Sequence, residues 1–176
     1  GDGDAGDDDT NVGDGGPATS AHLNMPSDVA LGPNGDIYIA DMHHQRVRKV
    51  DAKTRIITTV AGTGRWGNTG DGGPATAATL AGPAGITVVA DAAGKLTLFI
   101  ADYYNGRVRA VGADGIIREV SEDREAFDAP TRVAYSRRGG WLYVTDSSRD
   151  RLVVLNRKLR AQGVRSAQVG LRDTAV

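Results

Sequence analysis

An aspartate followed five residues later by an arginine occurs three times in the sequence. The pairs are Asp41 with Arg46, Asp102 with Arg107, and Asp146 with Arg151. A carboxylate at such a place can cap the backbone amides of a loop and pair with a cation across the turn, which would fix a hairpin. The alternative is a ring of carboxylates for metal binding or acid–base catalysis. We interpret the pairs as structural, because catalysis rarely needs one copy in every repeat.

Polar and aromatic residues fill the loop between each aspartate and its arginine. The first loop holds two adjacent histidines, and the other two loops hold tyrosines, an asparagine and an arginine. A surface that gathers aromatic rings, imidazoles and a guanidinium group is suited to recognition. We therefore predict a binding surface on this loop face. Its members are His43, His44, Trp66, Tyr103, Tyr104, Asn105 and Arg149.

Residues that bind metal ions are scarce. The chain has three histidines and no cysteine, and no third ligand follows the histidine pair at a regular spacing. The absence of cysteine also excludes a disulfide scaffold, a thiolate metal site and a cysteine nucleophile. We expect no catalytic residue, no metal and no cofactor. Five aspartates within residues 2–9 allow a calcium site, but they lack the order of an EF-hand loop, which favours a solvated acidic linker.

Length and charge limit the class of protein further. The 176 residues fit one domain, and the 40% hydrophobic content allows a core that is mostly aliphatic. No apolar run approaches the length of a membrane-spanning helix. The net charge of -1 argues against bulk nucleic-acid binding. The charge is uneven, because residues 1–22 hold six aspartates and no lysine or arginine, while residues 129–176 hold ten basic residues and three acidic ones.

Internal repetition organises the chain. The seven residues Gly-Asp-Gly-Gly-Pro-Ala-Thr occur at 13–19 and again, unchanged, at 70–76. We expect this heptapeptide to form a rigid bend between units, so that its first copy would mark the end of an absent preceding unit. The first residue is glycine, which we expect of a processed or excised chain. The expected domains are an acidic Gly/Asp-rich segment and linker over 1–22, then three units over 23–176, at about 23–64, 80–122 and 127–170.

Short strands account for each unit. In the first unit, apolar residues alternate with polar ones over four segments, at about 27–32, 36–41, 46–51 and 56–61. Turn residues separate these segments, and no window has helical periodicity over three turns. Four strands in a repeat of roughly 40–57 residues indicate the blade of a β-propeller. The predicted fold class is all-β, with twelve strands in three blades of four antiparallel strands.

The first unit resembles the NHL repeat of β-propellers. It reads Leu-x-x-Pro, then Gly-x-Ile-x-Ile-Ala-Asp, then Arg-Val-Arg-x-Val, and finally Ile-x-Thr-Val-Ala-Gly. The second unit departs from this pattern by a longer first hairpin, and the third is degenerate. The resemblance implies a propeller fold over about 23–170 and leaves the function open, because NHL propellers serve protein binding, RNA binding and lyase chemistry. NHL-like amidating lyases hold zinc through histidines from several blades, which the second and third units do not supply.

Three blades are too few to close a propeller, which needs about four to eight. We expect an open arc with a bare apolar blade face at each end. The predicted function is a non-enzymatic module for protein interaction or structural assembly. Its expected partners are further copies of itself or the remaining blades of a longer chain, and the Gly/Asp-rich segment favours an extracellular or surface location. The alternatives are part of an NHL-type lyase or hydrolase, and an RNA-binding propeller.

Overall fold

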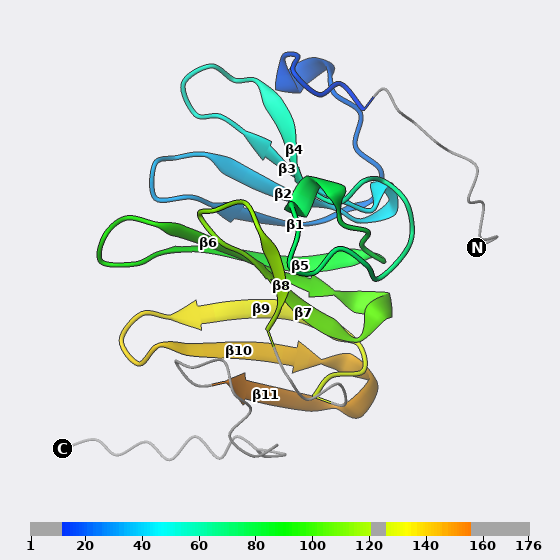
Figure 1. The fold of residues 1–176 in the computed structure, drawn as a ribbon, viewed down its shortest axis with the longest axis vertical. Helices are drawn as coiled ribbons and strands as arrows, with labels where there is room; N and C mark the ends of the chain where they lie inside the picture. Colours follow the sequence, from blue (N-terminus) through cyan, green and yellow to red (C-terminus); the bar gives the residue numbers. More distant parts are fainter. Residues whose placement is uncertain (1–11, 121–125, 156–176) are drawn as a thin grey trace.

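Three antiparallel sheets, stacked along the long axis, form the molecule (Figure 1). The computed structural model describes residues 12–120 and 126–155. In each sheet the strands pair in the order of the chain. The strands are β1 (Pro26–Leu31), β2 (Ile37–Asp41), β3 (Arg46–Val50), β4 (Ile57–Ala61), β5 (Pro83–Ala90), β6 (Leu96–Asp102), β7 (Arg107–Val111), β8 (Ile117–Glu119), β9 (Pro130–Ser136), β10 (Trp141–Asp146) and β11 (Arg151–Leu155).

The predicted all-β class and the propeller blades are confirmed. The first blade contains β1–β4, the second β5–β8 and the third β9–β11. The sheets do not close into a ring, as expected for a partial propeller. Eleven of the twelve expected strands lie in the described residues, and the expected last strand of the third unit falls outside them.

Short 3-10 turns are the helical elements of the described part of the chain. Three of them connect the second and third strands of a blade, and the other two belong to the heptapeptide segments. They are η1 (Ala18–Ser20), η2 (Met42–His44), η3 (Ala75–Ala77), η4 (Tyr103–Asn105) and η5 (Ser147–Arg149).

The apolar cores lie between the blades. We call the face of a blade that points toward the preceding blade its upstream face, and the opposite face its downstream face. Because side chains alternate along a strand, one strand supplies both faces. On β6, for example, Ile100 packs upstream against the first blade, while Phe99 and Ala101 pack downstream against the third.

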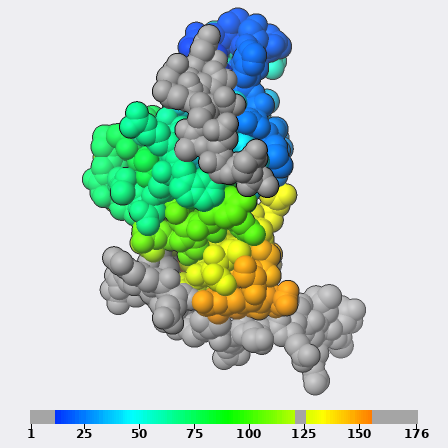
Figure 2. Space-filling view, turned by 90° about the vertical axis from the view of Figure 1, so that its right-hand side faces the viewer, coloured from blue at the N-terminus to red at the C-terminus, as the bar shows by residue number. Residues whose placement is uncertain are grey.

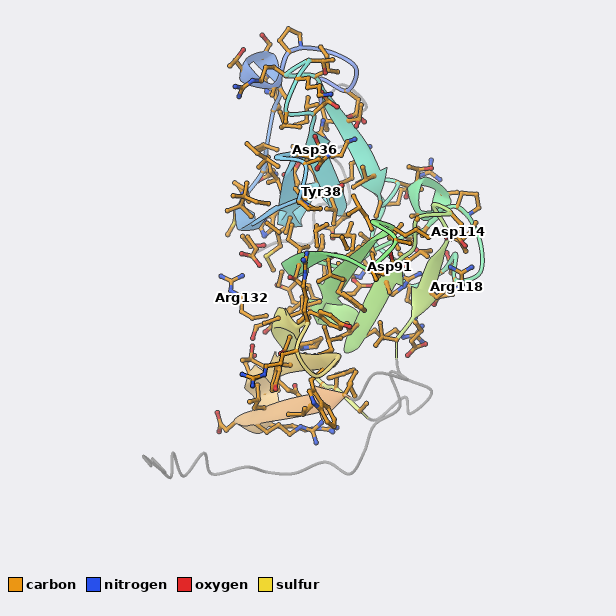
Figure 3. All side chains as sticks on the ribbon, turned by 90° about the vertical axis from the view of Figure 1, so that its left-hand side faces the viewer. Asp36, Tyr38, Asp91, Asp114, Arg118 and Arg132 are labelled. Carbon is orange, nitrogen blue, oxygen red and sulfur yellow. The ribbon has the colours of Figure 1, made fainter. Side chains whose placement is uncertain are left out.

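The strands β1, β5 and β9 are the innermost strands of the arc. Arg132, on β9, donates from one guanidinium nitrogen to the carbonyl oxygens of Ser27 and Ala84, at 3.1 Å each. It therefore joins the inner strands of all three blades. In Figure 3, Arg132 lies on the opposite side of the molecule from Asp114 and Arg118, which mark the outer edge of the second blade.

The heptapeptides do not act as simple bends between blades. We call residues 13–20 and 70–77 the first and second strap. Each strap pairs with the outermost strand of the blade that follows it. In the second strap, the Gly72 N–H donates to Ile117 O at 2.8 Å and the Ile117 N–H donates to Gly73 O at 3.0 Å. The first strap pairs with Ile57 in the same way. Each heptapeptide is therefore part of the blade that follows it, and the expectation that its first copy also ends a preceding unit stays a prediction.

Gly85 is the residue that lets the second and third blades approach. A Cβ built on it would lie 2.4 Å from the Thr131 carbonyl oxygen and 2.8 Å from the Arg132 Cα. Both are backbone atoms of β9, which cannot yield as the end of a flexible side chain can. The equivalent residue of the first blade is Asp28, whose carboxylate accepts the Ile86 N–H of β5 at 2.9 Å.

We expect Gly85→Ala to lower the free energy of unfolding by about 2 kcal/mol, because overpacking against a backbone forces the blades apart. Chemical denaturation measures this loss. The control is Gly16→Ala, where the nearest atom to the new Cβ would be the Gly13 carbonyl oxygen at 3.4 Å. An equal effect of the two substitutions would contradict the role assigned to Gly85.

Candidate functional site

The three 3-10 turns η2, η4 and η5 lie at one end of the arc, which we call the loop end. Each turn closes with a residue in the left-handed region: Gln45 at φ 53°, Gly106 at φ 61° and Asp150 at φ 45°. Figure 2 looks onto this end, where the segment between the first and second blades lies beside the second blade. The sequence predicts that these turns and the linkers share one end, and the hydrogen bond from Asn105 of η4 to Gly67 O of the linker agrees with this.

The aspartate before each turn is fully buried and binds the segment that enters the first strand of its blade. Asp41 accepts the Asn24 N–H at 2.7 Å, and Asp102 accepts the Ala81 N–H, also at 2.7 Å. Asp146 accepts the Ala129 N–H at 2.8 Å. The sequence suggested that these aspartates cap the backbone amides of their own turns, but none of the three forms such a side-chain hydrogen bond. They instead connect the loop end to the inner strand.

In the first two blades the cation beside the aspartate is not the predicted arginine. The guanidinium of Arg48, seven residues after Asp41, lies 3.3 Å from its carboxylate. Arg46 points elsewhere and donates to Thr63 O at 2.9 Å. The two arginines are two residues apart on β3, so they lie on the same face of the blade. Arg48 is completely buried beside the carboxylate, whereas Arg46, at the start of the strand, is half-buried.

The second blade repeats this arrangement. Arg109 lies 3.4 Å from the Asp102 carboxylate, whereas Arg107 is paired with Asp71 at 3.7 Å and Glu119 at 3.3 Å. In the third blade the predicted pair does form, because Arg151 contacts Asp146 at 2.9 Å.

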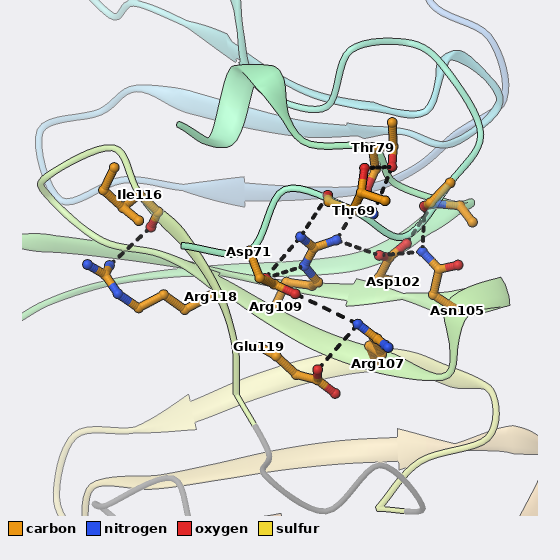
Figure 4. Close-up of polar contacts among 12 residues, drawn as sticks. Thr69, Asp71, Thr79, Asp102, Asn105, Arg107, Arg109, Ile116, Arg118 and Glu119 are labelled. Carbon is orange, nitrogen blue, oxygen red and sulfur yellow. Dashed lines mark hydrogen bonds and ion pairs between the residues drawn. The ribbon is translucent and has the colours of Figure 1, made fainter. Parts of the chain in front are cut away.

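Arg109 joins three segments (Figure 4). It is completely buried, and it contacts Asp71 of the second strap at 3.0 Å in addition to Asp102. The same two guanidinium nitrogens also donate to the carbonyl oxygens of Thr79 and Thr69. A buried cation is tolerated when it is paired and hydrogen bonded on several sides. Arg109 therefore fixes the strap to the strand that ends at the loop end.

Arg48 performs the same task in the first blade. It contacts Asp14 of the first strap at 2.7 Å and donates to Val12 O at 3.0 Å. The third blade has Val153 at the corresponding position, and no heptapeptide precedes that blade. The strap aspartate and the buried arginine thus occur together or not at all. This co-occurrence is the signal by which the sequence could have revealed both arginines.

Burial raises the pKa of Asp102 above the ordinary value for a carboxyl group, while the Ala81 N–H, Asn105 and Arg109 act in the opposite direction. The native state therefore holds this proton more tightly than the unfolded chain does. Ionised Asp102 is costly, and the contribution of the group to stability falls as the pH rises through its pKa. The nearby cation limits this loss.

Aromatic rings form an exposed cluster at the loop end. Trp66 and Tyr104 have ring centroids 4.8 Å apart, and Tyr103 meets Tyr104 edge-on at 4.7 Å. Trp66 is 60% exposed and Tyr104 is 55% exposed. We call these three residues the aromatic cluster. All three were predicted from the sequence to belong to a binding surface, and the structure brings them together.

Close packing holds the aromatic cluster in place. Tyr104 and the methyl group of Met42 both lie over Gly82, where a Cβ would be 2.5 Å from the tyrosine ring. The Gly82 N–H donates to the Gln45 side chain at 2.6 Å. Asn105, also named from the sequence, donates to Gly67 O and to Asp102 at 2.8 Å each. Met42, Gln45 and Gly82 were not identified from the sequence, because their contacts join two blades.

The remaining predicted site residues lie in different environments. His43 is exposed on η2, whereas His44 is buried and its Nδ1 lies 2.9 Å from Asp41. His44 is thus not presented on the surface, because the 3-10 turn directs adjacent side chains to different sides. Arg149 is exposed on the third blade, where its Nε lies 3.9 Å from the Asp128 carboxylate.

The described residues contain neither a metal-binding cluster nor a membrane-spanning helix. No three histidine, aspartate or glutamate side chains within 12–120 and 126–155 lie close enough to hold a metal ion together. Within the same ranges there is no helix long and apolar enough to cross a membrane. The aspartates at 2–9, for which a calcium site was considered, lie outside the described residues.

We expect Arg109→Met to lower the free energy of unfolding by about 3–5 kcal/mol at neutral pH, because it leaves the buried carboxylate of Asp102 without its cation and leaves Asp71 with its longer contact to Arg107. The difference from the wild type narrows as the pH falls toward 4, since protonation removes the buried charge. Denaturation at several pH values measures both effects. The control is Arg118→Met, whose ion pair with Asp114 is exposed and which should leave the transition midpoint unchanged. A pH-independent loss would contradict the assignment.

Comparison with known proteins supports the resemblance seen in the sequence. The family model of the NHL repeat matches residues 23–50. The protein Suppressor of quenching 1, a chloroplastic protein of Arabidopsis thaliana, is 32% identical over 89 residues, which are 51% of this chain and 8% of that protein. This chain therefore spans less than a tenth of that relative.

Solved structures resemble the fold. An auxiliary nutrient binding protein of Bacteroides ovatus has a TM-score of 0.58 at 19% identity, over 70% of this chain and 35% of that one. A chain of the nidogen/laminin complex has a TM-score of 0.56 at 20% identity, over 77% of this chain and 45% of that one. These likenesses concern the β-propeller fold. The chain therefore carries an NHL repeat, in the first of three blades that have the β-propeller fold.

Proposed function

We propose that the chain is a non-enzymatic module of an NHL-type propeller that binds another protein through its loop end. The observation that carries this proposal is the aromatic cluster of Trp66, Tyr103 and Tyr104. The Gly/Asp-rich segment at residues 1–22 favours an extracellular or surface location for this activity.

Exposed, fixed aromatic rings favour protein binding. Tryptophan and tyrosine offer a large apolar area together with one polar atom, and they lose little conformational freedom when they are already packed. Gly82 and Met42 lie beneath Tyr104, and Asn105 anchors the neighbouring loop through Gly67. The rings are thus arranged before a partner arrives, which reduces the entropy that binding must overcome.

The charges around the aromatic cluster favour a protein over a polyanion. Arg65, next to Trp66 in the chain, is exposed, but Arg107 and Arg109 are already paired with carboxylates. RNA binding depends on several free cations that contact phosphates. A mixed surface of aromatic rings, His43 and the exposed Arg65 is more typical of a protein interface than of an RNA-binding surface.

The environment of the acidic residues supports a non-catalytic role. Asp41, Asp102 and Asp146, the aspartates that end the second strands, are fully buried. Each accepts a backbone N–H from the segment entering its blade. A general acid or base has to reach the reacting group of a substrate. These carboxylates instead hold the loop end to the inner strands.

The proposal is tested by selecting a displayed library of random peptides on the full 176-residue chain. We expect enriched peptides whose Kd rises at least about tenfold with Trp66→Ala or Tyr104→Ala, because such substitutions remove the centre of the surface. The matched control is Trp141→Ala, which removes an exposed tryptophan from the third blade and should leave the Kd unchanged.

Two outcomes would overturn the proposal. One is that no peptide is enriched, or that the enriched peptides bind the two loop-end variants as tightly as the wild type. The other is that single-stranded RNA binds with a steep dependence on salt and that Trp66→Ala abolishes this binding, which would assign the loop end to nucleic acid.

A further inference from the structure

The upstream face of the first blade is an apolar surface, and no blade of the described ranges packs against it. Val29 is 61% exposed and Leu31 is 70% exposed, and Ile37 and Ile39 lie beside them on β2. A shallow hollow of about 420 Å³ opens there, lined by Pro26, Ser27, Asp28, Val29, Ile37 and Ile39. Large branched side chains on a free sheet face are unusual in a protein that has no partner there.

The same positions are buried in the other two blades. In the second blade Ile86, Leu98 and Ile100 are at most 5% exposed, and all three belong to the core shared with the first blade. In the third blade the equivalent residues Val133 and Val144 belong to the core shared with the second. The upstream face of a blade is therefore the surface that receives the downstream face of another blade.

Downstream faces have a common composition. In the first blade the face carries Tyr38, Ala40 and Val47. In the second blade Phe99, Ala101 and Val108 occupy the equivalent positions. An aromatic ring on the second strand is thus followed by a small residue on the same strand and by a branched aliphatic residue on the third.

The third blade keeps this composition on its own downstream face. The corresponding residues are Tyr143, Thr145 and Leu152, and Thr145 is exposed. Ala134, which pairs with Tyr143, is also exposed, and it corresponds to Ala30, which packs against the core between the first two blades. The chain therefore carries one upstream face and one downstream face of the kind that it joins twice internally.

We propose that a second copy of this chain covers the upstream face of the first blade with the downstream face of its third blade. The contact continues the blade-to-blade interface already present twice within the chain. Tyr143 of the second copy is the ring that the repeat places opposite the hollow beside Val29. Such a contact is heterologous, so it closes a ring where the rotation allows and otherwise extends as a filament. It is distinct from the loop end and does not depend on the aromatic cluster.

The first strap limits the area that the second copy covers. The outer part of the same upstream face, including Val50 and Ile57, is already buried. The strap pairs with Ile57, and Arg48 fixes it through Asp14. The second copy therefore covers the inner part only, on β1 and β2.

Light scattering on the full chain at high micromolar concentration tests the proposal. We expect a mass above the 18.4 kDa of one chain. Leu31→Glu should abolish assembly by placing a charge on the upstream face, and Ala134→Glu should abolish it by placing one on the downstream face. Both positions are exposed, so both variants should fold. Ala77→Glu, the same substitution at an exposed position of the second strap, is the matched control and should assemble as the wild type does.

Mixing the two inactive variants tests the orientation. The Leu31→Glu chain retains an unaltered downstream face, and the Ala134→Glu chain retains an unaltered upstream face. These two faces can bind each other, so an equimolar mixture should give a 1:1 pair of twice the mass of one chain. A wild type that stays monomeric would assign the face to another occupant, such as a blade of a longer chain, and would overturn the proposal. Assembly of either variant alone, or a mixture without the pair, would also overturn it. Neither variant should change peptide binding at the loop end.

Discussion

A buried arginine placed between two carboxylates is the interaction on which the first two blades depend. Arg109 contacts Asp102, which ends a strand, and Asp71, which belongs to the second strap. Arg48 joins Asp41 and Asp14 in the first blade. Each arginine lies on the third strand of its blade. It therefore connects the strap, which pairs with the outermost strand, to the aspartate at the loop end, which binds the segment that enters the blade. Without the cation, each blade would bury uncompensated negative charge.

The third blade shows what replaces this arrangement when the strap is absent. Val153 occupies the arginine position and packs in the core, and Arg151 at the start of the strand takes over the contact with Asp146. The aspartate keeps its bond to the entering segment in all three blades. The aspartate is therefore the constant part of the repeat, and the position of its cation varies. Where a strap aspartate also has to be bound, the cation is an arginine in the middle of the third strand; where no strap aspartate is present, it is the arginine at the start of that strand.

Periodicity predicted the strands well, because alternation of apolar residues and turn chemistry act over a few residues. The first blade's strands agree with the expected segments to within two residues. Contacts between distant segments could not be predicted in this way. The role of Arg48 depends on a strap more than thirty residues earlier in the chain, and the burial of His44 rather than His43 depends on the geometry of one 3-10 turn. The three residues of the aromatic cluster were named from the sequence as part of a binding surface, but the support of Tyr104 by Gly82 was not predicted, because it joins two blades.

The coupling between Asp71 and Arg109 tests the central claim most directly. A double-mutant cycle with Asp71→Asn and Arg109→Met, followed by chemical denaturation at neutral pH, isolates the interaction of the two groups. If the arginine holds the strap to the blade, the two losses should be strongly non-additive, by about 1–3 kcal/mol, because either substitution removes the same interaction. Losses that simply add would contradict the account, since they would mean that the strap and the buried arginine stabilise the blade independently.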